Sequence, residues 1–201
     1  MILRVDPRPT WKESHMLTAI KAATRTSCLK RGVGAVLVLN KREIASGYNG
    51  APSGMETCLD TGDCFYERIA WEDSLKGHGP FELLKEARKI SCIANHAESN
   101  AVQQCTDTGV SPRGATLIIT NFPCPRCVIR EIIPNKLEKV IVWKDYLANP
   151  ALTADELTIS TRLLESVGIP IEKMHLSEAR IRQIGEMYHR VGDKTEYVFK
   201  P

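Results

Sequence analysis

The chain has 201 residues, of which 43% are hydrophobic and 25% charged, proportions that exclude a disordered or collagen-like chain. Its net charge of +3 is too small to indicate a broad basic surface for nucleic acid. The longest apolar run, Ala35–Leu39, is far shorter than the roughly 20 residues of a membrane span, and charges at Arg4 and Asp6 exclude a signal peptide. We therefore expect one cytoplasmic domain whose seven cysteines are metal ligands or bystanders rather than disulfides.

The first half of the sequence predicts a helix capped by Thr10, then a β-hairpin, then a loop rich in Gly, Pro and Ser. From 51 to 91 no period is sustained apart from one short helix, so this stretch is predicted to be an insertion rather than a second domain. The predicted elements are a helix at Trp11–Cys28, strands at Val33–Leu39 and Ile44–Tyr48, a loop at 47–54 and a helix at Pro80–Lys89.

The second half alternates strands and helices, which predicts an α/β layer structure with a partly parallel sheet. Residues 176–201 are expected to form a helical tail that packs on the domain or on a neighbouring subunit. The predicted helices are Ala97–Cys105, Cys127–Ile133, 155–166 and Ser177–His189, and the predicted strands are Ala115–Thr120, Val140–Trp143 and Ile169–Met174.

Two short motifs carry the chemistry, His96-Ala97-Glu98 and Pro123-Cys124-Pro125-Arg126-Cys127. A catalytic zinc uses three His or Cys donors and keeps one position open, and His96, Cys124 and Cys127 supply that set. Glu98 is close enough in sequence to reach a water at the open position. A Cys-x-x-Cys pair alone is as often structural or redox-active, but the two motifs together form the signature of zinc deaminases.

Beyond this signature, the sequence resembles the deoxycytidylate (dCMP) deaminases of bacteria and phages, within the cytidine deaminase superfamily. The matching stretches are 25–36 (Arg-Thr-Ser-Cys-Leu-Lys-Arg-Gly-Val-Gly-Ala-Val), 47–54 (Gly-Tyr-Asn-Gly-Ala-Pro-Ser-Gly), 96–102, 114–117, 120–127 and 142–146. The resemblance implies a three-layer α/β/α fold with a mixed five-stranded sheet. It also implies hydrolysis of dCMP to dUMP and ammonia, which supplies dUMP for thymidylate synthesis in the cytoplasm of a cell or of a phage's host.

The resemblance also implies roles for single residues. Glu98 would take a proton from water, protonate N3 of cytosine and later pass a proton to the departing amine, while zinc would lower the pKa of that water from roughly 16 to about 7. Asn49 would bind the sugar hydroxyl and Tyr146 would lie against the base, although Asn49 could instead serve a turn and Tyr146 the core. Thr26 and Ala97 complete the expected substrate-binding residues.

The charge distribution suggests where a phosphate binds. Residues 1–50 have nine Lys and Arg against three Asp and Glu, and residues 51–90 have five against eight. The excess of +6 in the first segment is either a solvated basic face or the side of the domain that binds an anion. Because a 5′-phosphate needs cationic side chains, we expect Arg25, Lys30 and Arg31 near it.

The remaining cysteines suggest a second metal. Many relatives hold a structural zinc, so the resemblance implies a closed site formed by Cys28, Cys58, Cys64 and Cys92 that fastens the insertion to the core; the alternative is that they are small buried hydrophobes. Cys105 is expected in the core. The resemblance further implies a homo-oligomer such as a hexamer, and control by dCTP, with Mg²⁺, and by dTTP, although Asp107 stands where activated relatives often have a basic residue.

Two other classes of function remain open. The chain could be a deaminase that acts on 5-substituted dCMP, free cytidine or adenosine in tRNA. A polynucleotide substrate is not expected, because aromatic residues make up only 6% of the chain and the charge excess is confined to one segment. The chain could also be a zinc-stabilised binding module without catalysis, but a purely structural site has no need of Glu98.

Overall fold

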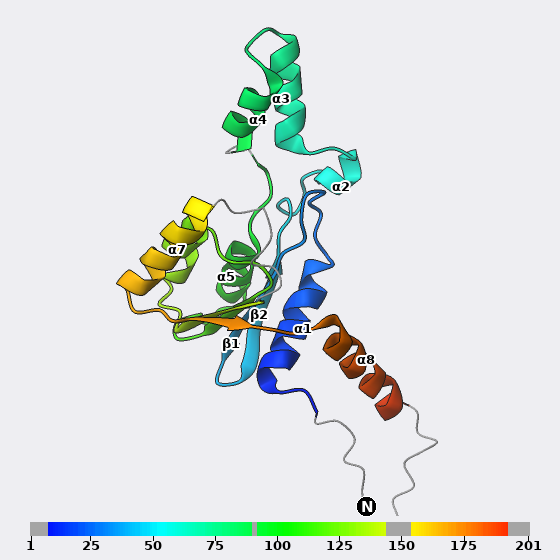
Figure 1. The fold of residues 1–201 in the computed structure, drawn as a ribbon, viewed down its shortest axis with the longest axis vertical. Coiled ribbons are helices and arrows are strands. Elements are labelled where there is room, and N and C mark those ends of the chain that lie inside the picture. The colour runs from blue at the N-terminus through cyan, green and yellow to red at the C-terminus, as the bar shows by residue number, and fades with distance from the viewer. Residues whose placement is uncertain (1–7, 90–91, 144–153, 193–201) are drawn as a thin grey trace, which may run out of the picture.

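The fold is taken from a computed structural model that describes residues 8–89, 92–143 and 154–192, the last six without their side chains. Its centre is a five-stranded sheet in the order β2-β1-β3-β4-β5 (Figure 1). Among the described residues, no helix is long and apolar enough to cross a membrane. The strands are β1 (Gly34–Leu39), β2 (Arg42–Tyr48), β3 (Thr116–Ile119), β4 (Lys139–Trp143) and β5 (Ile171–Met174).

The sheet is mixed, which confirms the predicted fold class. β1 pairs antiparallel with β2 and with β3, whereas β3, β4 and β5 run parallel. The hairpin turns at Asn40 and Lys41, whose φ angles of 52° and 64° give the left-handed conformation that suits a two-residue turn between twisted strands. Parallel strands need crossovers, and helices supply them between β3, β4 and β5.

Alternate side chains of each strand pack on opposite faces, so that the sheet lies between two helical layers. Leu37, Leu117 and Val140 face one core together with α5, the π-helix η2 and α7. Val36 and Ile118 face the other core with α1, and Ile181 brings α8 to the same side. The helices are α1 (Trp11–Ala23), α5 (Ala97–Thr108), α6 (Pro125–Cys127), η2 (Val128–Ile132), α7 (Ala154–Ser166) and α8 (Glu178–Gly192).

The first helix is shorter than the sequence predicts. Thr10 caps α1 as expected, in a capping box with Glu13, but the helix ends at Ala23 rather than Cys28. After Ala23 the hydroxyl of Thr26 donates hydrogen bonds to the backbone and side-chain oxygens of Asn49, which lie at the end of β2. The tertiary contact therefore draws the chain out of the helix and into a loop.

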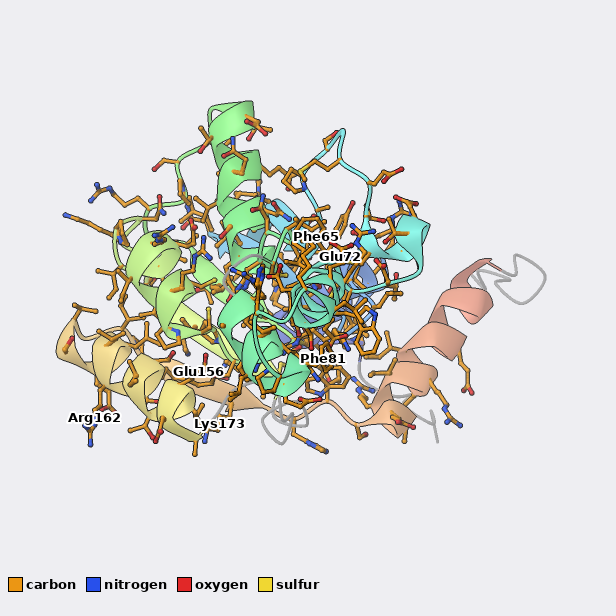
Figure 2. All side chains as sticks on the ribbon, turned by 90° about the horizontal axis from the view of Figure 1, so that it is seen from above. Phe65, Glu72, Phe81, Glu156, Arg162 and Lys173 are labelled. Atoms are coloured by element: carbon orange, nitrogen blue, oxygen red, sulfur yellow. The ribbon has the colours of Figure 1, made fainter. Side chains whose placement is uncertain are left out.

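The stretch from 58 to 89 folds into helices that project from the sheet as an arm (Figure 1). The prediction gave one helix here, whereas the structure has α2 (Cys58–Thr61), α3 (Phe65–Leu75) and α4 (Phe81–Arg88). α3 escapes prediction because its large apolar residues Trp71 and Leu75 stay exposed, so that they form no core-facing stripe. Trp71 packs edge-on against Phe81, and Figure 2 looks down on the arm, with Phe65, Glu72 and Phe81 over the body of the molecule.

Helix α5 lies directly on edge strand β2. The side chain of Asn100 donates to the carbonyl of Tyr48 at 2.7 Å, and the side-chain oxygen of Gln104 accepts from the backbone N–H of Ser46 at 2.6 Å. Gly47 allows this approach, since a Cβ there would lie 2.3 Å from the carbonyl oxygen of Ala97. The strand thus fixes the position of the helix whose first turn contains the His-x-Glu motif.

Candidate active site

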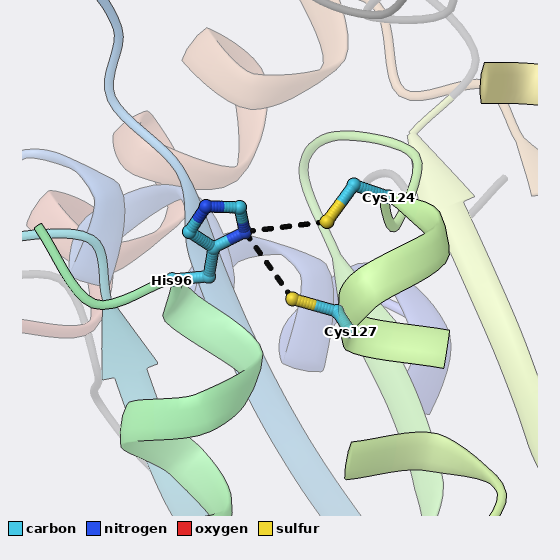
Figure 3. Close-up of side chains that lie close together, drawn as sticks. All are labelled: His96, Cys124 and Cys127. Atoms are coloured by element: carbon cyan, nitrogen blue, oxygen red, sulfur yellow. Dashed lines mark hydrogen bonds between the residues drawn. The ribbon is translucent and has the colours of Figure 1, made fainter. Parts of the chain in front are cut away.

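Three candidate metal donors meet at the N-termini of two helices. His96 is the N-cap residue of α5 and Cys124 is that of α6, where Pro125 provides the fixed φ that favours a first helical position. The Nδ1 atom of His96 lies 3.5 Å from the Sγ of Cys124 and 3.2 Å from that of Cys127 (Figure 3). Within the described residues, these three form the only group of His, Cys, Asp or Glu side chains whose ligand atoms gather within 4.8 Å.

The electrostatics of these donors suit a cation. The pKa of His96 is raised, chiefly because the sulfur of Cys124 accepts its N–H. The pKa of Cys124 is lowered, chiefly by a hydrogen bond from Cys127, and that same bond raises the pKa of Cys127. These shifts favour negative charge on Cys124 beside His96, at two helix N-termini, and the donor set of one imidazole and two thiols fits Zn²⁺ with a fourth position left for water.

Glu98 lies beside these donors and is almost fully buried, with 4% of its surface exposed. Burial raises its pKa to about 7, against an opposing effect from the nearby charge of His96. Cys127 is near enough to lower this pKa through a hydrogen bond, which shows that the carboxyl group faces the donor cluster. A carboxyl group that titrates near neutral pH can both accept and release a proton at that pH.

Asn49 and Thr26 belong to one hydrogen-bond network next to the start of β1. The side-chain oxygen of Asn49 accepts from the backbone N–H of Val33 at 2.7 Å and from the hydroxyl of Thr26 at 3.0 Å. Its amide nitrogen donates to the carbonyl of Arg31 at 3.0 Å, which leaves one N–H for a further acceptor. Asn49 therefore holds the loop between α1 and β1, residues 24–33, whatever else it binds.

The basic residues expected near a phosphate have different surroundings. Arg25 and Arg31 are exposed on the loop that Asn49 holds. Lys30 instead pairs with Glu67 of α3 at 2.6 Å, so it joins this loop to the arm. Its pKa is raised because Glu67 accepts its hydrogen bond. Tyr146 lies outside the described residues, and Ala97 is fully buried beneath Gly47.

The four cysteines assigned to a structural zinc lie in loops and at helix starts near the base of the arm. Cys58 and Cys64 are buried, Cys28 is half-buried and Cys92 is exposed, and they do not form a group with ligand atoms within 4.8 Å. They are nevertheless close enough to interact. Although Cys92 as a residue is exposed, partial burial of its thiol raises its pKa, and the charges of Cys28 and Cys58 add to this. The pKa of Cys64 is raised by burial and then by Glu67 and Cys58. Cys105 is buried in the main core, as expected.

Two polar residues at the end of β3 were missed by sequence reasoning. The hydroxyl of Thr120 accepts from the backbone N–H of Gly34 at 3.1 Å and donates to the side-chain oxygen of Asn121 at 3.0 Å. Both residues are at least nine-tenths buried. The signal was present in the sequence, because a Thr-Asn pair ends an apolar strand just before the Pro-Cys motif, where burial requires polar partners.

Several known proteins are similar to this chain in sequence or in fold. The deoxycytidylate deaminase of Mycobacterium phage D29 is 34% identical over 138 residues, which cover 69% of this chain and 98% of that protein. ComE operon protein 2 of Bacillus subtilis is 30% identical over 171 residues, 85% of this chain and 75% of that protein. The crystal structure of the dCMP deaminase from cyanophage S-TIM5 in complex with dCMP and dUMP matches with a TM-score of 0.56 and 26% identity, over 84% of this chain and all of that one.

A family match covers both chemical motifs. Residues 9–144 match the family described as the cytidine and deoxycytidylate deaminase zinc-binding region, a span that includes His96, Glu98 and the Cys124–Cys127 pair. The match confirms the resemblance noted in the sequence and covers more than half of the chain. The chain therefore belongs to the cytidine and deoxycytidylate deaminase family.

Proposed function

We propose that this chain hydrolyses dCMP to dUMP and ammonia. The observation that supports this most directly is the buried carboxyl group of Glu98 against the His96, Cys124 and Cys127 cluster, in a fold shared with a solved structure that contains dCMP and dUMP. Zinc held by these three donors would supply an activated water at neutral pH. Proton transfer and substrate binding are assigned to the protein's own residues.

Glu98 is the proton carrier in this proposal. It takes a proton from water as the new C–O bond forms at C4 of cytosine, and it delivers that proton to N3. It then takes the remaining proton from the new C4 hydroxyl and passes it to the amino group as the C4–N bond breaks and the C4 carbonyl forms, so that water and dCMP give dUMP and ammonia. The backbone N–H of Cys124, at the start of α6, stabilises the tetrahedral centre that forms at C4.

The nucleotide would lie along the loop that Asn49 holds. The free N–H of Asn49 is assigned to the sugar hydroxyl, and the exposed Arg25 and Arg31 on the same loop are assigned to the 5′-phosphate. Thr26 fixes Asn49 for this contact, Ala97 is kept among the proposed substrate-binding residues, and Tyr146 would lie against the base. Lys30 is left out of the phosphate site because Glu67 already neutralises it.

The test is ammonia release from four compounds: dCMP, deoxycytidine, 5-methyl-dCMP and a single-stranded DNA oligonucleotide. We expect dCMP to have the highest kcat/KM, and Arg25→Ala and Arg31→Ala to raise KM for dCMP more than for deoxycytidine. Faster turnover of 5-methyl-dCMP would instead identify a deaminase of modified nucleotides. A zinc-loaded chain that released ammonia from none of the four would overturn the proposal in favour of a binding module.

We also propose a structural zinc on Cys28, Cys58, Cys64 and Cys92, at the base of the arm. The pKa effects that link Cys92 to Cys28 and Cys58 support it, because they place three of the thiols within electrostatic reach. Purified protein should contain two zinc ions per chain, and Cys64→Ser should contain one. Cys105→Ser, a change in the core, should keep two. A single zinc ion in the wild-type chain would disprove this second site.

Regulation and assembly complete the proposal. The resemblance supports control by dCTP with Mg²⁺ and by dTTP, and a closed homo-oligomer such as a hexamer. Asp107 on α5, where a cation would favour an anionic effector, argues against strong activation. A titration of dCTP at subsaturating dCMP that left both rate and cooperativity unchanged would exclude control by dCTP. Sedimentation analysis would determine the number of subunits in the oligomer.

A further inference from the structure

One hydrogen bond joins the two helical segments that contain the metal donors. The hydroxyl of Ser99 in α5 donates to the carboxylate of Glu131 in η2 at 2.8 Å, and both residues are half-buried. Among the described residues, no other hydrogen bond links α5 to the α6–η2 segment, apart from contacts within the cluster of Glu98, His96, Cys124 and Cys127. We call this contact the Ser99–Glu131 clamp.

The clamp lies one helical turn from the donors on both sides. Ser99 follows His96 by three residues and Glu131 follows Cys127 by four, spacings that place each pair on one face of its helix. η2 is a π-helix, in which the N–H of Ile133 bonds to the carbonyl of Val128, five residues earlier. Wide turns of this kind are frequently found at functional sites, and the extra residue redirects the side chains that follow. Here the turn presents Glu131 toward α5.

The clamp differs from the contacts among the donors themselves. Metal binding replaces the hydrogen bonds between His96 and the two cysteines, because the same atoms become ligands. Ser99 and Glu131 are not among the donors, so their bond persists whether or not a metal is bound. It limits how far the first turn of α5 can move from η2, and therefore how far His96 can move from Cys124 and Cys127.

We propose that Ser99 and Glu131 are positioning residues that hold the two halves of the metal site in register and so set its affinity for zinc. This inference rests on the proposed function only in that zinc binds to His96, Cys124 and Cys127. It is independent of which nucleotide is the substrate. Residues that orient metal ligands without touching the metal typically change its affinity by about 10- to 100-fold when they are replaced.

The test measures zinc affinity by competition with a chromogenic chelator, in the full-length chain. Ser99→Ala and Glu131→Ala should each weaken zinc binding by about tenfold, the lower end for residues of this kind. The double variant should be no weaker than either single one, because both remove the same bond. Glu131→Gln keeps an oxygen that can accept from Ser99, so it should stay near the wild-type affinity.

A matched control lies on the same helix. Gln103→Ala removes a side-chain hydrogen bond of the same length, to Asp107, that stays within α5 and should leave zinc affinity unchanged. The proposal would be overturned if Ser99→Ala and Glu131→Ala bound zinc like wild type, if their losses multiplied in the double variant, or if Gln103→Ala lost as much. Ser99→Ala raises helix propensity, so its loss of affinity would not reflect unfolding. A chain that bound zinc but failed to release ammonia from dCMP would refute the proposed function and leave this result intact.

Discussion

Gly47 of β2 passes so close to Ala97 of α5 that a Cβ atom on it would lie 2.3 Å from the carbonyl oxygen of Ala97 and 2.5 Å from the backbone nitrogen of Ala101. Both neighbours are backbone atoms of one helix, so they cannot rotate away as a side chain would. The helix as a whole would have to move, and with it His96 and Glu98 at its first turn.

The first prediction follows from this contact. Gly47→Ala should destabilise the protein by about 2–4 kcal/mol, because overpacking forces backbone shifts. Because Glu98 would be displaced, kcat should fall by a larger factor than KM changes. Urea denaturation and steady-state kinetics would measure both. Gly185→Ala is the control, since a Cβ there meets nothing within 4 Å. Wild-type stability in Gly47→Ala would show that α5 has room to move.

The second prediction concerns Glu98. Glu98→Gln cannot carry a proton between water and the base, so kcat for dCMP should fall by about 10²- to 10⁴-fold. Zinc content should remain that of the wild-type chain, because Glu98 is not one of the three donors. Glu138→Gln, an exposed change at the far end of β4, should have no effect. Activity within tenfold of wild type in Glu98→Gln would remove Glu98 from its assigned role.

The third prediction separates the two roles of Asn49. Asn49→Ala removes the acceptor of the Val33 N–H and one of the two donors to the carbonyl of Arg31, which should lower the free energy of unfolding by about 1–3 kcal/mol even without nucleotide. Asn49→Asp keeps the acceptor for Val33 and should lose less. Equal denaturation midpoints for wild type and Asn49→Ala would limit Asn49 to substrate binding.

The fourth prediction is a pH dependence of stability. Both carboxylate oxygens of Glu13 in α1 accept hydrogen bonds from Arg180 of α8, at 2.9 and 3.3 Å. Hydrogen bonding to Arg180 is the main reason that the pKa of Glu13 lies below its ordinary value of 4.5. A carboxyl group whose pKa is depressed by folding stabilises the protein above its ordinary pKa, and this contribution is lost as the pH falls through the folded value.

The matching variant is Glu13→Gln, which keeps the capping box with Thr10 and removes only the charge. It should be less stable than wild type by about 1 kcal/mol at pH 7, and the gap should close as the pH falls below the ordinary value of 4.5. Urea midpoints at pH 7 and at pH 3 would measure the gap. Glu82→Gln, at an exposed pair with Lys85, should show no gap at either pH. A gap of the same size at pH 3 would contradict the assignment to charge.

Much of the fold is predictable because its signals are local. The β-branched, apolar run at Val33–Leu39 and the helical spacing around Ala97–Cys105 depend on residues a few positions apart, and those elements form as expected. α3 was missed for the same reason, because Trp71 and Leu75 pack on no core and thus leave no periodic signal.

In the candidate site, too, only the residues that form a local pattern can be predicted. The donors are recognisable because Cys124 and Cys127 share one turn and His96 lies two residues before Glu98. Contacts between distant segments are not encoded in any short pattern. The bonds of Thr26 to Asn49, the pair of Lys30 with Glu67, and the clamp between Ser99 and Glu131 all needed the three-dimensional structure.

Helix α5 also protects the sheet from other chains. β2 is an edge strand, and a row of unpaired backbone groups on such a strand is a template for pairing with a second molecule. Asn100 and Gln104 occupy two of these groups, the carbonyl of Tyr48 and the N–H of Ser46. Replacing either side chain would therefore free a backbone group on this edge for pairing with another chain, so these two positions bear on aggregation as well as on the placement of α5.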